Sequence, residues 1–201
     1  MLGRVRFGSR QAARHASFAG TMSADAWEVL ESRYLLERYW LKLREDRVRT
    51  SSGAIIEQFH VLEQPSWAAV VCVTERGELV LSEQYRHGVR AVTLELPAGV
   101  IEPHEEALEG ARRELREETG YEAEEWAHLL TVHPEPSRHA HTAHFFVARG
   151  ARATSAQALD TTENVRVRTL PLSDLDAVIE RLGHGAHIGA LLLAERRGLL
   201  R

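Results

Sequence analysis

Cysteine is almost absent from this chain of 201 residues, because Cys72 is the only one. A single cysteine allows no internal disulfide, which favours a reducing, cytoplasmic location. Cys72 stands inside the apolar run Ala68–Val73. We therefore expect it to be a small buried residue and not a nucleophile.

Long apolar runs and an excess of basic charge are also missing. No apolar stretch approaches the roughly 20 residues of a membrane span, so we expect no membrane partner. The net charge is −4, the pI is near 6.3 and Lys42 is the only lysine, so nothing indicates a nucleic-acid partner. The length and a hydrophobic content of 44% predict one domain of ordinary size with a small appendage.

The first 21 residues contain four arginines and no acidic residue. We expect residues 1–21 to form a mobile leader, with a targeting peptide as the alternative. The absence of a long apolar core in this segment argues against secretion. Met22, followed by Ser-Ala-Asp-Ala-Trp, would also make a natural start, so the true start stays open between Met1 and Met22.

Residues 22–64 have the pattern of a small antiparallel β-sheet. We predict strands over residues 27–32, 39–44 and 55–61, the last of them after a turn at Ser51–Gly53. Three strands bury little by themselves, so this appendage should pack on its own core or on a second subunit.

Residues 65–201 alternate between strand and helix patterns. The periodicity predicts strands over 68–74, 78–82, 92–96, 126–133, 143–147 and 165–170, and helices over 172–181 and 188–196. Residues 75–77 should make a hairpin turn, and Gly120 should end a further helix that precedes it. The expected fold class is α+β, with a mixed β-sheet between helices.

The stretch GVIEPHEEALEGARRELREETGY, from Gly99 to Tyr121, contains the most informative residues. Glu114, Glu117 and Glu118 fall within about one turn of the predicted helix, where like charges repel. Three stacked carboxylates indicate a multivalent cation, and hard oxygen ligands suit magnesium or manganese, which share their shells with substrate phosphates. The stretch therefore predicts divalent-metal phosphate chemistry.

The alternative is a solvated helix face with salt bridges. At about 100° per residue, Leu108, Ala111 and Leu115 mark the packed side, and Glu114 and Glu118 lie at its edge. The arginines fall on the other flank (Arg112, Arg113 and Arg116). We therefore expect Glu114 and Glu118 to be turned away from the arginines, so that they need another partner.

The same stretch resembles the Nudix box, G-x5-E-x7-R-E-U-x-E-E-x-G-U, where U is a bulky apolar residue. Eight positions match at the required spacing, and Tyr121 fills the last apolar position (Gly99, Glu105, Arg113, Glu114, Leu115, Glu117, Glu118 and Gly120). The flanks Gln84–Arg86 and Glu95–Gly99 look like those of ADP-ribose and nucleoside diphosphate sugar pyrophosphatases. The resemblance implies a Nudix fold and places the hydrolase domain at residues 65–201.

The resemblance also implies a set of metal ligands. Glu114, Glu117 and Glu118 would bind the metal from the helix, and the Ala98 carbonyl would add a backbone ligand. Gly99 would leave room where a side chain would crowd the ion. Glu105 and Arg113 occupy positions that orient the loop and the helix in this family. The expected metal is Mg²⁺, with Mn²⁺ as a substitute.

For the substrate, a nucleotide sugar, we expect Arg86 to clamp a phosphate through its planar guanidinium. Glu95, in the second flank, belongs to the same expected substrate site. In the resembling enzymes the N-terminal sheet is exchanged across a homodimer, which makes Tyr34 and Trp40 candidates to stack a base. Packing within the sheet is the alternative for both aromatic residues.

Two carboxylates compete for the role of general base, which would deprotonate the attacking water. Glu117 lies inside the box, and Glu163 lies in the loop Asp160–Asn164, which in the resembling enzymes closes over the metals. We predict that Glu163 contributes to the catalytic step and Glu117 to the metal shell, with Glu163 as a metal ligand instead of the base as the alternative.

Other functions stay open at this point. The histidines near Pro134–His139 permit a zinc site (His139, His141 and His144), although zinc prefers ligands on a fixed frame. The loop has the prolines of ADP-ribose pyrophosphatases but lacks the acidic residue that often follows its serine, which leaves another nucleoside diphosphate sugar open. A Nudix hydrolase of GDP-mannose or dinucleoside polyphosphates and a non-catalytic Nudix sensor are further alternatives.

Overall fold

The structure is a computed structural model that describes residues 25–200. The predicted leader 1–21 and the alternative start at Met22 lie outside these residues. The chain divides into two compact units: residues up to Arg33 with Glu45–Phe59 form one, and Tyr34–Arg44 with the chain from His60 onward form the other. The predicted domain boundary between residues 64 and 65 stays a prediction.

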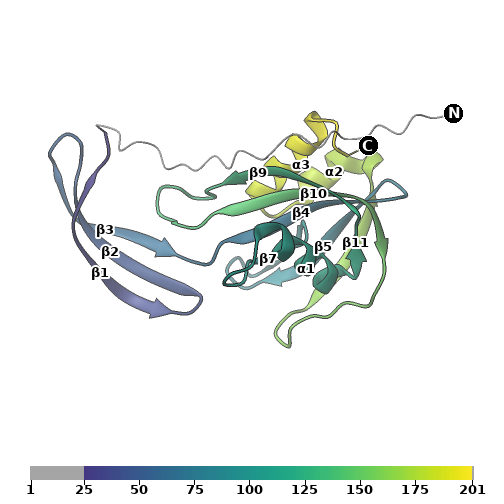
Figure 1. Cartoon of the computed structure of the whole chain (residues 1–201), viewed down its shortest axis with the longest axis horizontal. Helices are drawn as coiled ribbons and strands as arrows, with labels where there is room; N and C mark the ends of the chain where they lie inside the picture. Colours follow the sequence, from purple (N-terminus) through teal and green to yellow (C-terminus); the bar gives the residue numbers. More distant parts are fainter. Residues whose placement is uncertain (1–24, 201) are drawn as a thin grey trace. The chain divides into compact units, whose positions relative to one another are not determined.

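The first three strands form a separate sheet in the order β1-β2-β3, with bounds Glu28–Arg38, Leu41–Arg49 and Ile55–Glu63 (Figure 1). The first predicted strand was too short and the second began too early. Tyr39 and Trp40 form the turn between β1 and β2, where their rings meet edge to face with centroids 4.6 Å apart. Aromatic residues favour strands on average, and here a two-residue hairpin connection overrides that preference.

The second sheet has the order β11-β5-β4-β10-β8, with β6 paired to β5, β7 to β4 and β9 to β10. It is mixed, because β10 runs parallel to β4 and antiparallel to β9. The strands are β4 (Trp67–Thr74), β5 (Glu78–Arg86), β6 (Ala91–Glu95), β7 (Ala98–Val100), β8 (Tyr121–Glu122), β9 (Glu125–Val132), β10 (Ala143–Ala153) and β11 (Val165–Pro171).

Helices cover both faces of this second sheet (Figure 1). α1 (Ala107–Thr119) packs on one face, while α2 (Leu175–Arg181) and α3 (Gly185–Arg196) pack on the other. The predicted helix 172–181 begins as one 3₁₀ turn, Leu172–Asp174, before α2. No helix within residues 25–200 combines the length and the apolar character needed to cross a bilayer.

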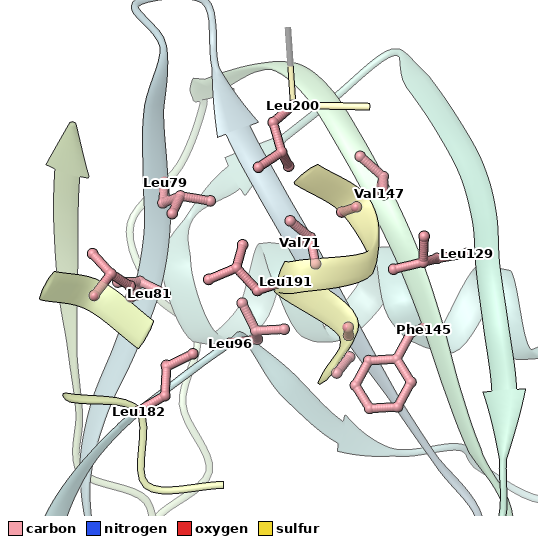
Figure 2. Packing of buried hydrophobic residues seen from close by; sticks show 14 of the residues in the cluster. Val71, Leu79, Leu81, Leu96, Leu129, Phe145, Val147, Leu182, Leu191 and Leu200 are labelled. Carbon is pink, nitrogen blue, oxygen red and sulfur yellow. The ribbon is translucent and has the colours of Figure 1, made fainter. Parts of the chain in front are cut away.

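Strand β4 shows how one sequence builds both layers. Val71 and Val73 face α2 and α3, whereas Val70 and Cys72 face α1, because successive side chains of a strand alternate between faces. Figure 2 shows the first layer, with Leu191 of α3 surrounded by side chains from the strands. Cys72 is buried, as predicted, and burial raises the pKa of its thiol to about 12.

Helix α1 ends where the sequence predicted. Gly120 adopts the left-handed conformation, with φ +73°, and its N–H donates to the Arg116 carbonyl at 2.8 Å. A Cβ on Gly120 would lie 2.2 Å from the Ser155 carbonyl oxygen. Glycine is therefore required here both for its conformation and for the close approach of the next chain segment.

Candidate active site

Three side chains of α1, Glu114, Glu117 and Glu118, form the carboxylate group of the candidate site. Glu118 is the buried member, with only 4% of its surface exposed. Its Oε2 accepts hydrogen bonds from the Ser82 hydroxyl at 3.0 Å and from the Ala98 N–H at 3.1 Å. Burial raises the pKa of Glu118 to about 8, despite these hydrogen bonds, and the negative charges of Glu114 and Glu163 add to the rise. The carboxylate is thus fixed by β5 and β7 at a place where its own charge is costly.

Glu114 lies one turn before Glu118, directly against the backbone of Gly99. A Cβ on Gly99 would lie 2.1 Å from the Glu114 carboxyl carbon and 2.2–2.3 Å from both of its oxygens. Gly99 does not have a positive φ, so its missing side chain matters for space and not for backbone freedom. Burial also raises the pKa of Glu114, although Arg113 opposes that rise.

Arg113 connects the acidic residues around it. Its Nε and Nη2 donate to Glu105 at 3.0 and 2.9 Å, and Nη2 also donates to the Val100 carbonyl at 2.9 Å. Its Nη1 donates to Glu114 at 2.7 Å and to Glu117 at 3.2 Å. The expectation that Glu114 is turned away from the arginines is therefore wrong, because the long Arg113 side chain reaches across the helix to it.

The two candidate bases have different surroundings. Glu117 is held by Arg113, with Arg116 3.9 Å away on its other oxygen. Glu163 lies in the exposed loop before β11, and its Oε2 accepts a hydrogen bond from the Asp160 N–H at 3.1 Å. The charge of Glu163 raises the pKa of both half-buried Glu114 and buried Glu118, so Glu163 lies within electrostatic range of these two carboxylates.

The donor chemistry of this group fits a hard divalent cation. Only oxygen ligands are present, burial disfavours the charge of Glu114 and Glu118, and a cation would relieve it. Within residues 25–200, no three His, Cys, Asp or Glu side chains converge closely enough to enclose a metal ion by themselves. A cation that keeps several waters, as magnesium does, needs no such complete cage.

The histidines proposed for zinc do not converge either. The rings of His139 and His141 lie 5.4 Å apart, centroid to centroid, whereas both ring nitrogens of His144 bond to threonines, Thr131 at 3.1 Å and Thr142 at 3.1 Å. Their geometry gives the zinc alternative no support.

Arg86 and Glu95 form a bidentate pair beside the carboxylate group. Arg86 Nε and Nη2 donate to the two Glu95 oxygens at 2.8 and 2.6 Å, and Thr93 donates to Glu95 at 2.6 Å. Burial alone would raise the pKa of Glu95, but these hydrogen bonds outweigh it and lower the pKa to about 2. Two of the three Arg86 nitrogens therefore donate to Glu95.

A cavity of about 550 Å³ opens next to these residues. Trp40, Arg86 and Glu95 line it together with Ala98 and Gly99, which also contact the carboxylate group. Tyr34 is not among the lining residues: its hydroxyl donates to Glu63 at 3.0 Å, and the Lys42 ammonium lies 5.4 Å from its ring centre. The two predicted base-stacking residues therefore have different environments.

Several residues of the site carried no recognisable signal in the sequence. Ser82 lies in a buried stretch of β5 without polar alternation, and Thr93 precedes Glu95 in a short strand. His184 and His187 come to the cavity from the start of α3, far along the chain. Only tertiary packing brings these residues to the site.

These features define a Nudix hydrolase. Residues 63–188 match the NUDIX domain family, which establishes that the chain belongs to the Nudix family, as the box predicted. Residues 27–62 match the nucleoside diphosphate sugar hydrolase N-terminal domain family. Nudix hydrolases generally need a divalent metal, in agreement with the donor set of this site.

Relatives with similar sequences include two kinds of protein. The chain is 33% identical over 135 residues to a methanol dehydrogenase activator of Bacillus methanolicus, covering 67% of this chain and 72% of that protein. It is 31% identical to the ADP-ribose pyrophosphatase of Bacillus subtilis (strain 168), covering 60% of this chain and 65% of that one. The ADP-ribose pyrophosphatase of Mycobacterium tuberculosis is also 31% identical, with 65% and 63% covered.

A solved structure, the crystal structure of an ADP compounds hydrolase, shares the fold. It superposes with a TM-score of 0.77 over 89% of this chain and 98% of that chain, at 21% identity. The predicted α+β Nudix fold with a small N-terminal sheet is thereby confirmed.

Proposed function

We propose that this Nudix hydrolase cleaves the diphosphate bond of ADP-ribose or a related nucleoside diphosphate sugar. From ADP-ribose the products would be AMP and ribose 5-phosphate. The observation that carries the proposal is the pair formed by half-buried Glu114 and buried Glu118, which lies against Ala98–Gly99 at the edge of a cavity large enough for a diphosphate and a sugar. The names of two relatives and the N-terminal domain family support the substrate class.

Mg²⁺ is the proposed metal, with Mn²⁺ as a substitute. Glu114, Glu117 and Glu118 would hold it together with the Ala98 carbonyl. When bound, such an ion neutralises phosphate oxygens and lowers the pKa of a bound water. Arg113 and Glu105 hold the helix carboxylates in place through the hydrogen bonds described above, and a second layer of this kind fixes ligand geometry.

The other roles follow from the cavity. Arg86 orients the diphosphate through Nη1, while Glu95 and Thr93 fix the plane of its guanidinium. The exposed indole of Trp40, at the cavity, stacks a ring of the substrate. Glu163 accepts the proton of the attacking water from its loop beside the carboxylates, and Glu117 completes the metal shell.

The substrate proposal is tested by turnover over a panel of ADP-ribose, ADP-glucose, GDP-mannose and diadenosine polyphosphate. We expect the highest kcat/KM for a nucleoside diphosphate sugar, with activity lost in EDTA and restored by Mg²⁺. Preference for the dinucleoside polyphosphate would select the alternative Nudix substrate class. No turnover of any compound, with binding retained, would identify a non-catalytic sensor.

We further propose a cytoplasmic homodimer. The described strands of the N-terminal sheet expose large apolar side chains, among them Val29 at 58% and Leu35 at 46%, and a symmetric pair is a common way to cover such a surface. Light scattering should give twice the chain mass at micromolar concentration. A fully active monomer would contradict this assembly.

A further inference from the structure

Two histidines in the cavity wall have ring nitrogens that the fold does not satisfy. His141 and His184 both line the cavity, and the Nδ1 atom of each is buried without a hydrogen-bond partner in residues 25–200. The His141 residue itself is only 8% exposed. A buried polar atom without a partner destabilises the folded protein, so two such atoms in the lining of one cavity require an explanation.

These imidazoles are not built to hold phosphate. Burial lowers the pKa of both His141 and His184, so both rings are neutral at pH 7. Arg86 supplies the cationic group of the described cavity lining, and it lies with Glu95 near Ala98 and Gly99. His184 lies within electrostatic range of both Arg86 and Glu95, so its ring adjoins the group proposed to orient the diphosphate.

Aromatic rings pack around His184. The Trp67 ring meets the His184 ring edge to face at 5.4 Å, and His184 stacks on His187 at 4.2 Å. His187 is fixed in turn, because its Nδ1 accepts a hydrogen bond from the Leu96 N–H at 3.2 Å. In this stacked pair, the Nδ1 atom of His187 therefore has a hydrogen-bond partner within the described residues, whereas the Nδ1 atom of His184 has none.

We propose that His141 and His184 recognise the hydroxyl groups of the sugar that follows the diphosphate. A neutral imidazole has one donor and one acceptor, which suits a hydroxyl that can both donate and accept. Cavities of this kind bind mostly through apolar surface, with a few polar groups that fix orientation.

This inference rests on the proposed function for the choice of substrate, and its test is a binding cycle without turnover. ADP-ribose and ADP are titrated in EDTA into the wild-type protein, His184→Phe and His141→Phe. We expect each variant to lose about 3–10-fold in affinity for ADP-ribose, as for one neutral hydrogen bond, with the affinity for ADP unchanged. His128→Phe is the matched control, because His128 is an exposed residue of β9 and does not line the cavity.

The nitrogen-15 NMR signals of the two imidazole rings provide an independent test of sugar contact. In nitrogen-15 spectra the imidazole signals of His141 and His184 should move with ADP-ribose and stay in place with ADP. Phenylalanine removes an unsatisfied nitrogen, so both variants should keep or raise the Tm. If His141→Phe does not fold, His184→Phe and the two ring signals decide the question.

Equal losses for ADP and ADP-ribose would overturn the proposal, because the histidines would then contact the nucleotide half. Unchanged affinity for ADP-ribose, or wild-type protein that binds ADP and ADP-ribose alike, would overturn it as well. Hydrolysis of ADP-ribose is measured separately with Mg²⁺. Sugar-dependent binding without hydrolysis would overturn the proposed function and leave the roles of His141 and His184 standing.

Discussion

At the scale of single residues, the site places carboxylates where burial disfavours their charge. Glu118 is buried, accepts two hydrogen bonds and still has a pKa raised to about 8. Glu114 has room only because Gly99 has no side chain. Both arrangements cost stability and leave a place for a cation, a trade that is common at catalytic sites.

Substituting each candidate base separates their roles. Glu163→Gln should lower kcat by roughly 10²–10⁴-fold with metal affinity kept, as for the loss of a general base. Glu117→Gln should instead weaken metal binding. Both are measured by steady-state kinetics with Mg²⁺ titration. A Glu163→Gln enzyme with near-normal kcat would transfer the base role to Glu117.

Gly99→Ala should lower metal affinity while leaving stability nearly unchanged. The new Cβ would overlap the Glu114 carboxyl group, which is the free end of a flexible side chain and can move away. We expect the free energy of unfolding to change by less than about 1 kcal/mol and metal affinity to fall about 10–100-fold, as for a displaced ligand shell. Urea unfolding and metal titration measure the two effects.

The control for Gly99→Ala is Gly189→Ala in α3, where a Cβ would meet nothing within 4 Å. That variant should keep its metal affinity and gain up to about 1 kcal/mol of stability, since alanine is favoured over glycine inside a helix. A Gly99→Ala protein with unchanged metal affinity would show that the position of the Glu114 carboxylate is not required.

At the scale of secondary-structure elements, α1 is fixed at its end by Gly120. Gly120 and Gly77 both have φ +73°, but a Cβ on Gly77 would meet open space, while one on Gly120 would meet the Ser155 carbonyl. Gly77→Ala should cost about 1–2 kcal/mol from backbone strain alone. Gly120→Ala should cost at least about 1 kcal/mol more, since the backbone of residue 155 must shift. If urea unfolding shows that both substitutions lower the free energy of unfolding equally, the close approach of the Ser155 carbonyl to Gly120 does not have this role.

The elements also show how far the sequence can predict the structure. Strand β4 and helix α1 were predictable, because β4 is a continuous apolar run, helical periodicity marks the packed side of α1, and Gly120 marks the end of the helix. The turn at Tyr39 and Trp40 was not, since local aromatic content favours a strand. The contacts of Ser82 and His187 depend on strands and helices far apart in sequence, and no local pattern indicates them.

At the scale of the whole molecule, α3 packs on one face of the second sheet, and α1, which carries the carboxylates of the site, packs on the other. His187 of α3 is 1% exposed and accepts a hydrogen bond from Leu96, two residues before Ala98. Burial lowers the pKa of His187 to about 3. The folded protein therefore requires this ring to be neutral.

The pH dependence of stability follows from that requirement. In the unfolded chain His187 takes up a proton near pH 6.5, whereas in the folded protein it does so only near pH 3. The contribution of neutral His187 to the free energy of unfolding is therefore complete above about pH 6.5 and is lost as the pH falls. As the pH falls from 7 to 5, the wild-type protein should lose up to about 1.4 kcal/mol per pH unit relative to His187→Asn, which does not titrate. Parallel urea-unfolding curves for the two proteins across this range would contradict the assignment.

The central claim is metal-dependent cleavage of a diphosphate bond between a nucleotide and a sugar phosphate. The most direct measurement is phosphorus-31 NMR of ADP-ribose with the enzyme in oxygen-18 water, with Mg²⁺ and then with EDTA. We predict AMP and ribose 5-phosphate, with the label in one of the two phosphates and no reaction in EDTA. Unchanged turnover in EDTA, or ADP and free ribose as products, would contradict it.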